Sequence, residues 1–189
     1  PCRGPHHTAS TVSLAGGGKY ARPGEISLAH NGVLFLDEMP EYDKKAIETL
    51  RQPLEDGAIT ISRNSQTVKY PASFTLIASM NPCKCGYFGD ANRECTCTPN
   101  QINQYHSRIS GPLLDRFDLH IEVAPVEFDD ISSEKKEETS LEIRKRVQAA
   151  RAIQTERFKN TRTTCNALIT ADKLQEFCPM DDNAKALMK

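Results

Sequence analysis

The sequence predicts an α/β fold built around a parallel sheet. Two short apolar runs, residues 32–38 and 74–78, have the composition of buried strands. A helical pattern lies between them at 43–57, and charged helical sequence follows from residue 132. Strands that alternate with helices indicate a parallel sheet, and such sheets bind ligands beyond the carboxyl ends of their strands.

The first elements differ in how clearly the sequence defines them. Residues 1–31 have little periodicity and many turn formers, so we expect a loop or a flexible insert. The first strand, 32–38, ends in Asp37 and Glu38, and its four consecutive apolar residues predict that both of its faces are covered.

A helix and a hairpin are expected next. Asp43 can cap the helix, Gly57 stands where it would end, and four apolar residues share one helical face: Ala46, Ile47, Leu50 and Leu54. Residues 58–71 alternate as in a β-hairpin with a four-residue polar tip, 63–66.

The second core strand ends just before Asn81, and a cysteine-rich segment, 83–97, then interrupts the domain. Residues 119–123 alternate between apolar and polar side chains, so we expect a third strand there. Residues 132–158 predict a charged helix, and Thr170 begins a further helical stretch that continues to the last residue.

Composition limits the classes of function. The net charge is −1, from 24 Lys and Arg against 25 Asp and Glu, which gives no global signal for nucleic acid. The longest apolar run, 33–36, is too short to span a bilayer, and no signal peptide is visible. We therefore expect a cytoplasmic protein without membrane contact. Because no initiator Met is present, we also expect the chain to be an internal part of a longer protein.

The two acids at the end of the first strand suit nucleotide hydrolysis. The first carboxylate can hold Mg²⁺ through water, and the second can polarise the water that attacks a γ-phosphate. The alternative is an ordinary strand followed by a polar loop. Taken alone, Asp37 and Glu38 favour that alternative, and the order of the surrounding motifs decides between the two.

That order resembles the AAA+ ATPases of the magnesium chelatase-like YifB/ComM family. The similarity rests on a Walker B-like segment at 32–38, the helix and hairpin after it, Ser-Met-Asn-Pro at 79–82, Pro-Leu-Leu-Asp-Arg-Phe-Asp at 112–118, Gly-Pro-His-His-Thr at 4–8, the segment 23–32, and Arg-Gln-Pro-Leu-Glu-Asp-Gly at 51–57. It covers nearly the whole chain.

The resemblance implies a fold and a set of roles. Residues 1–128 would form part of a three-layer α/β/α AAA+ core with a pre-sensor-1 hairpin, and 129–189 a linker helix and the beginning of a helical lid. Asp37 would be the Mg²⁺-side acid, Glu38 the catalytic base and Asn81 the first sensor of ATP. Arg116 would be an arginine finger toward a neighbouring subunit. The alternatives are a salt bridge of Arg116 with Asp115 or Asp118 and a turn cap by Asn81.

A phosphate-binding P-loop is missing from the sequence. The Gly-Gly-Gly-Lys-Tyr stretch at 16–20 lacks the first Gly at the required spacing and the Ser or Thr after Lys. In the family the P-loop lies upstream of these residues. We therefore expect ATP and Mg²⁺ as cofactors of the longer protein, and weak or no nucleotide binding by this chain alone.

Four of the seven cysteines form two close pairs, Cys83 with Cys85 and Cys95 with Cys97. Four thiolates suit a structural Zn²⁺, although the one-residue gap within each pair is shorter than usual. Four free thiols or two disulfides are the alternatives. His106 is a competing ligand, and we expect it to be solvated instead. For His6 and His7 we expect ordinary polar packing rather than a metal site.

Small local excesses of positive charge suggest DNA contacts. We select Lys19 in the glycine-rich loop, with Arg63 and Lys69 in the hairpin, as residues that would grip phosphates without reading sequence. A solvated surface is the alternative.

The resemblance implies a homo-hexameric helicase that remodels branched or single-stranded DNA, as relatives of the ComM type do. One alternative is a motor subunit of a magnesium chelatase, which drives metal insertion into a porphyrin. Another is a non-catalytic, zinc-bearing interaction module of AAA+ shape.

Overall fold

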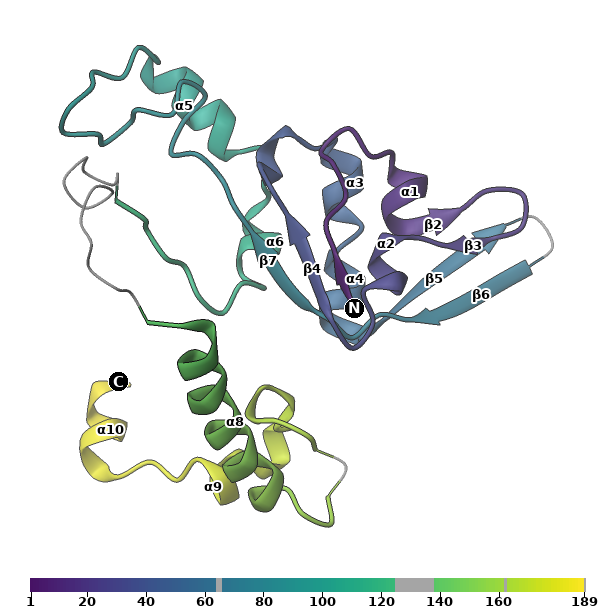
Figure 1. Cartoon of the computed structure of the whole chain (residues 1–189), viewed down its shortest axis with the longest axis vertical. Coiled ribbons are helices and arrows are strands. Elements are labelled where there is room, and N and C mark those ends of the chain that lie inside the picture. The colour runs from purple at the N-terminus through teal and green to yellow at the C-terminus, as the bar shows by residue number, and fades with distance from the viewer. Residues whose placement is uncertain (64–65, 125–137, 162, 189) are drawn as a thin grey trace. The chain divides into compact units, whose positions relative to one another are not determined.

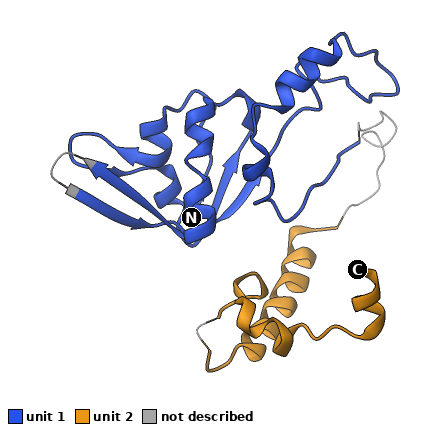
Figure 2. Ribbon diagram, turned by 180° about the vertical axis from the view of Figure 1, so that it is seen from behind, with its two compact units in different colours: residues 1–125 blue, residues 126–189 orange. Residues whose placement is uncertain are grey.

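A computed structural model of the chain describes residues 1–63, 66–124, 138–161 and 163–188, without the side chains of Arg63 and Gln66. The chain divides into two compact units, 1–125 and 126–189 (Figure 2). The first unit is mixed α/β with a small parallel sheet, and the second is helical. Among the described residues, no helix combines the length and the apolar character that crossing a bilayer requires.

The sheet of unit 1 has three parallel strands (Figure 1). In spatial order they are β1 (Cys2–Arg3), β4 (Val33–Leu36) and β7 (Thr75–Ala78). Val33 lies opposite Thr75 and Leu36 opposite Ala78, so β4 and β7 end at the same level. The two apolar runs are therefore strands, as the sequence predicts.

Short helices lie between and after these strands. Between them are α1 (Thr11–Ala15), α2 (Glu25–Leu28), the 3₁₀ turn η1 (Met39–Glu41), α3 (Lys44–Glu48) and α4 (Arg51–Asp56), and after β7 come α5 (Pro99–His106) and α6 (Gly111–Leu114). Asp43 caps α3 by accepting the backbone N–H of Lys45 at 2.9 Å, and Gly57 ends α4 in the left-handed region with φ 63°. The single helix expected at 43–57 is instead two helices. Pro53 has no N–H to donate to the carbonyl of Thr49, which is where the break occurs.

Two hairpins lie beside this sheet. One consists of β5 (Ala58–Arg63) and β6 (Gln66–Pro71), and the other of β2 (Gly16–Gly17) and β3 (Arg22–Pro23). Arg63 pairs with Gln66, so the expected four-residue tip is reduced to residues 64 and 65, which lie outside the described residues. The hydroxyl of Tyr70 donates to the carbonyl of Ala21 at 2.9 Å and joins the two hairpins.

The expectation of a loop at 1–31 is wrong. These residues form α1, α2 and three short strands, and Leu14, Ile26 and Ala29 are fully buried. Elements of two to five residues are shorter than the windows in which periodicity can be measured, which is why the sequence pattern misses them.

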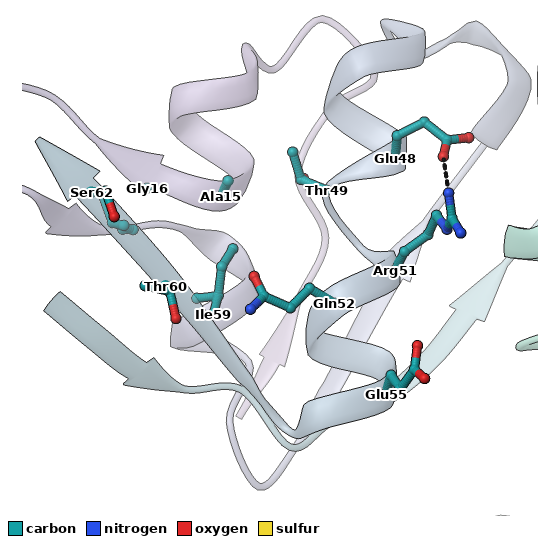
Figure 3. A pocket seen from close by; sticks show the side chains of 11 residues that line it. Ala15, Gly16, Glu48, Thr49, Arg51, Gln52, Glu55, Ile59, Thr60 and Ser62 are labelled. Atoms are coloured by element: carbon teal, nitrogen blue, oxygen red, sulfur yellow. Dashed lines mark ion pairs between the residues drawn. The ribbon is translucent and has the colours of Figure 1, made fainter. Parts of the chain in front are cut away.

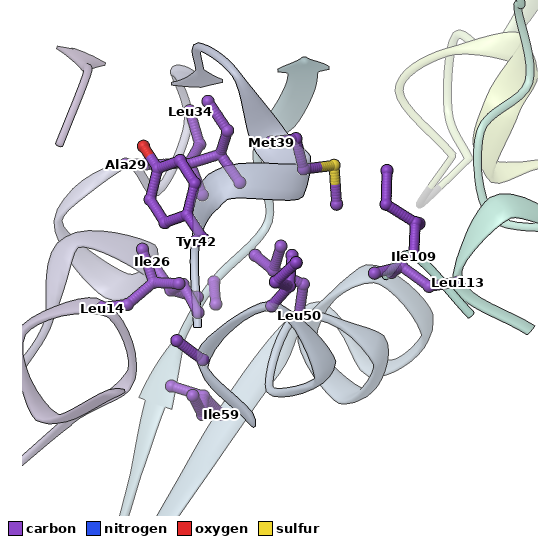
Figure 4. Packing of buried hydrophobic residues seen from close by; sticks show 14 residues of the cluster. Leu14, Ile26, Ala29, Leu34, Met39, Tyr42, Leu50, Ile59, Ile109 and Leu113 are labelled. Carbon is purple, nitrogen blue, oxygen red and sulfur yellow. The ribbon is translucent and has the colours of Figure 1, made fainter. Parts of the chain in front are cut away.

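The core of unit 1 lies between the helices and one face of the sheet (Figure 4). Leu34 and Leu36 are fully buried, whereas Phe35 is 38% exposed on the other face and Ile77 on β7 is 48% exposed. The expectation that both faces of the first strand are covered is therefore wrong for the described residues.

Residues 119–123 are also not the strand that their alternation predicts. They have no ladder partner among the described residues, and Leu119, Ile121 and Val123 are each more than 80% exposed. Because a strand exists only through hydrogen bonds to a neighbour, alternation alone does not make one.

Unit 2 has little core of its own. It contains α8 (Ser140–Arg157), η2 (Asn166–Leu168), η3 (Ala171–Lys173), α9 (Leu174–Phe177) and α10 (Asp182–Leu187). The helix expected at 132–158 is α8 from Ser140 to Arg157, and residues 132–137 of that expectation lie outside the described residues. The helix expected from Thr170 is three short pieces. All side chains of α8 are at least partly exposed, and Phe158 packs against Phe177 with ring centres 5.1 Å apart.

Candidate functional site

Asp37 and Glu38 follow β4 and meet the end of β7 through one serine. The hydroxyl of Ser79 donates to Oδ1 of Asp37 at 2.5 Å and accepts the backbone N–H of Glu38 at 3.1 Å. The carbonyl of Ser79 accepts the backbone N–H of Met39 at 2.9 Å. Both carboxylates are exposed, so the sheet presents two solvated acids on a turn that backbone hydrogen bonds hold in place.

Glu38 adopts a left-handed backbone conformation, with φ 51° and ψ 47°. Non-glycine residues in this region cost on the order of 1 kcal/mol or more, and they are found where the surroundings impose them. Here the hydrogen bonds of Ser79 and the buried Met39 and Pro40 fix the chain on either side. The conformation turns the Glu38 side chain away from the path of the strand.

A pocket of about 340 Å³ lies in front of these acids. It is lined by Gly4, Pro5, His6, His7, Phe35, Asp37 and Glu38. Nδ1 of His7 lies 3.6 Å from Oε2 of Glu38, and the His6 and His7 rings are 4.1 Å apart. The hydroxyl of Tyr42 holds this loop by donating to the carbonyl of Pro5 at 2.5 Å. His7 thus lies beside the carboxylate of Glu38, whereas the sequence led us to expect only ordinary polar packing.

Asn81 lies at the same edge of the sheet, two residues after Ser79, and its side chain is exposed. Burial raises the pKa of Tyr105, the backbone N–H of Asn81 lowers it by a hydrogen bond, and the charges of Glu41 and Glu38 raise it further. Tyr105 therefore lies near the backbone of Asn81 and feels the charge of Glu38, and the structure brings three of the four predicted catalytic residues to one edge.

Arg116 has a different partner. Its Nη2 lies 2.8 Å from Oε2 of Glu55, which raises the pKa of Arg116 and lowers the pKa of Glu55. The salt-bridge partner of Arg116 is therefore Glu55, and not Asp115 or Asp118 as in the alternative that we considered. The side chain of Arg116 is 35% exposed, so another molecule can reach it at the surface.

A second, larger hollow of about 590 Å³ contains none of the predicted residues (Figure 3). α3, α4 and β5 form most of its wall, and the loose ion pair of Glu48 with Arg51, 3.6 Å apart, lies at its edge. Glu55 lines it as well, which places the partner of Arg116 at its border.

The four cysteines of the 83–97 segment form one cluster. Their sulfur atoms all lie within 4.8 Å of one another, and the separations among Cys83, Cys85 and Cys95 are 3.3, 3.5 and 3.7 Å. A tetrahedral site with Zn–S bonds of about 2.3 Å has sulfur–sulfur edges of roughly 3.8 Å. The residues present therefore fit a tetrahedral thiophilic cation.

The pKa values of the clustered thiols are shifted in opposite directions. The backbone N–H of Tyr87 is the main cause that lowers the pKa of Cys85, to about 5. The backbone N–H of Cys97 lowers the pKa of Cys95, but burial and the neighbouring sulfurs outweigh it and raise this pKa to about 12. Four thiolates this close repel one another unless a cation lies between them. His106 is not a ligand here, because its Nε2 donates to the carbonyl of Pro82 at 2.7 Å.

The residues predicted to contact DNA lie on the two hairpins. Lys19 and Lys69 are exposed, and the side chain of Arg63 lies outside the described residues. Nζ of Lys19 is 5.7 Å, and the guanidinium of Arg22 6.0 Å, from the ring centre of Tyr20, which is 70% exposed. A solvated aromatic ring between two cations can stack on a base, and the sequence argument did not select it.

Ser79, His7 and Tyr105 are further neighbours of the site that sequence reasoning missed. A register drawn between the two predicted strands would have placed Ser79 beside Asp37, since Ala78 pairs with Leu36. No sequence pattern indicated the position of His7, because the strand before its loop, β1, is only two residues long and could not be predicted. Tyr105 reaches the edge from α5, beyond the cysteine cluster.

Similar proteins were found along the whole chain. Residues 1–131 match the family model described as magnesium chelatase, subunit ChlI, and residues 137–189 match the model of the C-terminal part of that subunit. The protein YifB of Salmonella typhimurium is 45% identical over 191 residues, which covers 99% of this chain and 36% of that protein.

Two other relatives indicate the range of the similarity. Competence protein ComM of Haemophilus influenzae is 45% identical over 184 residues, covering 96% of this chain and 35% of ComM. Magnesium-chelatase subunit ChlI of Mesostigma viride is 27% identical over 128 residues, covering 68% of this chain and 29% of that subunit. The chain thus spans about a third of the length of the most similar of these relatives.

Proposed function

Since this chain belongs to the magnesium chelatase ChlI-like family, with YifB and ComM among its relatives, we propose that it supplies the hydrolytic half of an AAA+ ATPase site. The main support is that Asp37, Glu38 and Asn81 follow two paired parallel strands at one edge, beside a pocket. Ligands of α/β sheets bind at this edge.

Each residue would have one role. Asp37, oriented by the Ser79 hydroxyl, would hold Mg²⁺ through water, and the exposed carboxylate of Glu38 would accept a proton from the attacking water. The Asn81 amide would hydrogen-bond the γ-phosphate or position that water. His7, 3.6 Å from Glu38, would orient the base. The phosphate-cradling loop would come from another part of the longer protein.

Arg116 would act in a neighbouring subunit of a homo-hexamer, where its charge would stabilise the transferring phosphoryl group. To do so it would have to leave Glu55, to which it is bonded in this chain. In this proposal residues 1–128 belong to an α/β/α core and 129–189 to a linker helix and the start of a lid. The surface position of Arg116 supports a role between subunits.

We further propose that hydrolysis drives the remodelling of branched or single-stranded DNA in the cytoplasm. The supporting observations are the name of the relative ComM, a competence protein, and the exposed cations of the two joined hairpins, Lys19 and Lys69, with Arg63 next to the tip. Zn²⁺ would be held by Cys83, Cys85, Cys95 and Cys97 in a structural role.

The first test concerns a full-length protein that contains this segment. Glu38→Gln should lower the ATPase rate about 10²–10⁴-fold, the usual contribution of a general base, and leave ATP binding intact. Glu48→Gln changes the same residue type on α3, outside the proposed site, and should hydrolyse ATP normally. A Glu38→Gln protein that kept its turnover would remove Glu38 as the base.

A second function has its own support, because both family models and the Mesostigma viride relative are described as magnesium chelatase. In that case the motor would drive metal insertion into a porphyrin. The two proposed functions predict different stimulators of ATP hydrolysis. Forked or four-way DNA should raise the ATPase rate of the wild-type protein, whereas stimulation by a porphyrin and not by DNA would favour the chelatase function.

A further inference from the structure

The last two residues of α5, Tyr105 and His106, lie against the backbone just after β7. Nε2 of His106 donates to the carbonyl of Pro82 at 2.7 Å, and the backbone N–H of Asn81 lies near enough to the Tyr105 hydroxyl to lower its pKa. Tyr105 is 5% exposed, so its ring is fixed by packing. The end of α5 therefore fixes the backbone from which the Asn81 side chain projects.

The cysteine loop, 83–97, connects the two partners of this contact. It begins directly after Pro82 and ends directly before Thr98, which caps α5 with a full capping box. Of its residues only Cys83 is buried, and the loop contains no helix or strand. Packing alone thus gives this loop little order, while its first and last residues adjoin the segments that contact each other.

Four sulfur atoms gather between the two ends of the loop. Cys83 and Cys85 come from its beginning, Cys95 and Cys97 from its end, and all four sulfurs lie within 4.8 Å of one another. A cation bound by all four would join the residue after Pro82 to the residue before Thr98. It would then hold the start of α5 at a fixed distance from the end of β7.

We infer that a thiophilic divalent cation in the cysteine cluster positions Asn81 through α5, with Tyr105 and His106 as positioning residues. The inference rests on the proposed function, in which the Asn81 amide contacts nucleotide. With the cation bound, the loop is closed and α5 holds the Asn81–Pro82 backbone. Without it, the start of α5 is released, and the hydrogen bond from His106 and the packed ring of Tyr105 no longer fix that backbone.

The segment just after α5 also reaches the turn that follows Glu38. Nη1 of Arg108 lies 3.9 Å from Oε2 of Glu41 on η1, and Ile109 is buried in the core. The helix and the residues directly after it thus contact the segments that follow both strands of the site. Its position therefore affects the geometry between Asn81 and Glu38, and this predicts an effect on turnover more than on nucleotide affinity.

The experiment uses a full-length protein that contains this segment, prepared with Zn²⁺ and after removal of Zn²⁺ by a chelator under reducing conditions. Metal per chain, hydrogen exchange of residues 79–82 and 99–106, and the kcat and KM for ATP are measured. We expect about one Zn²⁺ per chain. Removal should speed exchange in both segments, and it should lower kcat roughly tenfold, about 1.4 kcal/mol, with KM changed less than about twofold. Added Zn²⁺ should restore all three.

Variants of His106 separate positioning from folding. His106→Ala should keep one Zn²⁺ per chain and still lower kcat, whereas His106→Gln retains an N–H donor for the Pro82 carbonyl and should recover most of the rate. Unchanged exchange at 79–82 after metal removal would overturn the inference while leaving the proposed ATPase intact. Faster exchange in a protein with no ATPase activity would instead support the metal-dependent contact and contradict the proposed function.

Discussion

Two segments of unit 1 follow neighbouring strands and differ in what orders them. The turn after β4 contains Asp37 and Glu38, and buried residues support it, with Met39, Pro40 and Tyr42 all less than 2% exposed. The cysteine loop after β7 has one buried residue, Cys83, in fifteen positions. The first segment is thus ordered by the core, while the second is held by contacts among its sulfurs and by polar contacts of Asp90 and Arg93.

The comparison teaches that one edge of a sheet can combine two different sources of order. Burial of apolar side chains and backbone hydrogen bonds act wherever the chain is folded. Metal binding adds order that depends on the supply of cation and on the redox state of the thiols. Changes in the core and changes in the loop should therefore have separable effects.

The largest expected effect comes from the core. Leu36→Ala removes a fully buried side chain of β4 and should lower the free energy of unfolding by about 2–5 kcal/mol. Thermal unfolding followed by circular dichroism measures this loss. Leu141→Ala on α8, where the leucine is 61% exposed, is the matched control and should change stability by less than about 0.5 kcal/mol. If Leu36→Ala also released the metal well below its melting temperature, the two sources of order would not be independent.

A smaller effect is expected where the loop joins α5. Thr98 accepts the backbone N–H of Gln101 at 3.3 Å as the helix cap, so Thr98→Ala should weaken α5 by about 0.5–2 kcal/mol. Hydrogen exchange should become faster in 99–103 and remain unchanged in β4. Thr98→Ser keeps the capping oxygen and should behave like the wild type. Equal acceleration in β4 would show that the helix and the sheet open together.

The smallest effect comes from an ion pair at the other side of the sheet. Nε of Arg3 on β1 lies 2.6 Å from Oε2 of Glu25 on α2, and this hydrogen bond lowers the pKa of Glu25. Arg3 is 41% exposed, so solvent screens the pair, and Arg3→Met should lower the melting temperature only slightly at pH 7.

The pH dependence of that loss has a definite sign. The pKa of Glu25 is lower in the folded chain than in the unfolded chain, where it is about 4.3. The pair therefore stabilises the fold fully above the unfolded pKa, and this stabilisation is lost as the pH falls through the folded pKa. The difference in melting temperature between wild type and Arg3→Met should therefore vanish in acid. Arg51→Met, which removes an exposed arginine from the looser pair with Glu48, is the control. A difference that grew in acid would contradict the assignment.

Local chemistry explains which parts of the fold were predictable. Asp43 and Gly57 mark helix ends by capping and by positive φ, and both effects act within a few residues. The proximity of Asp37 to the end of β7 followed from the shared ends of parallel strands, and the cysteine cluster followed from the spacing of its residues.

The parts that could not be predicted depend on partners distant in sequence. β1 is a strand because β4 lies beside it, and no pattern in two residues can show this. Residues 119–123 show the reverse case. Their alternation is clear, but they have no strand partner among the described residues. The pairing of Arg116 with Glu55 joins residues 61 positions apart, which composition near either one does not indicate.

The left-handed backbone at Glu38 implies a conflict between folding and chemistry at a single position. Glycine would occupy φ 51° without steric cost, so a chain optimised for stability alone would have glycine there. Retaining a carboxylate instead leaves the turn less stable than glycine would make it, and the surrounding hydrogen bonds offset that loss. Stabilising substitutions at this position should consequently be easy to find and should, under the proposed chemistry, yield inactive proteins.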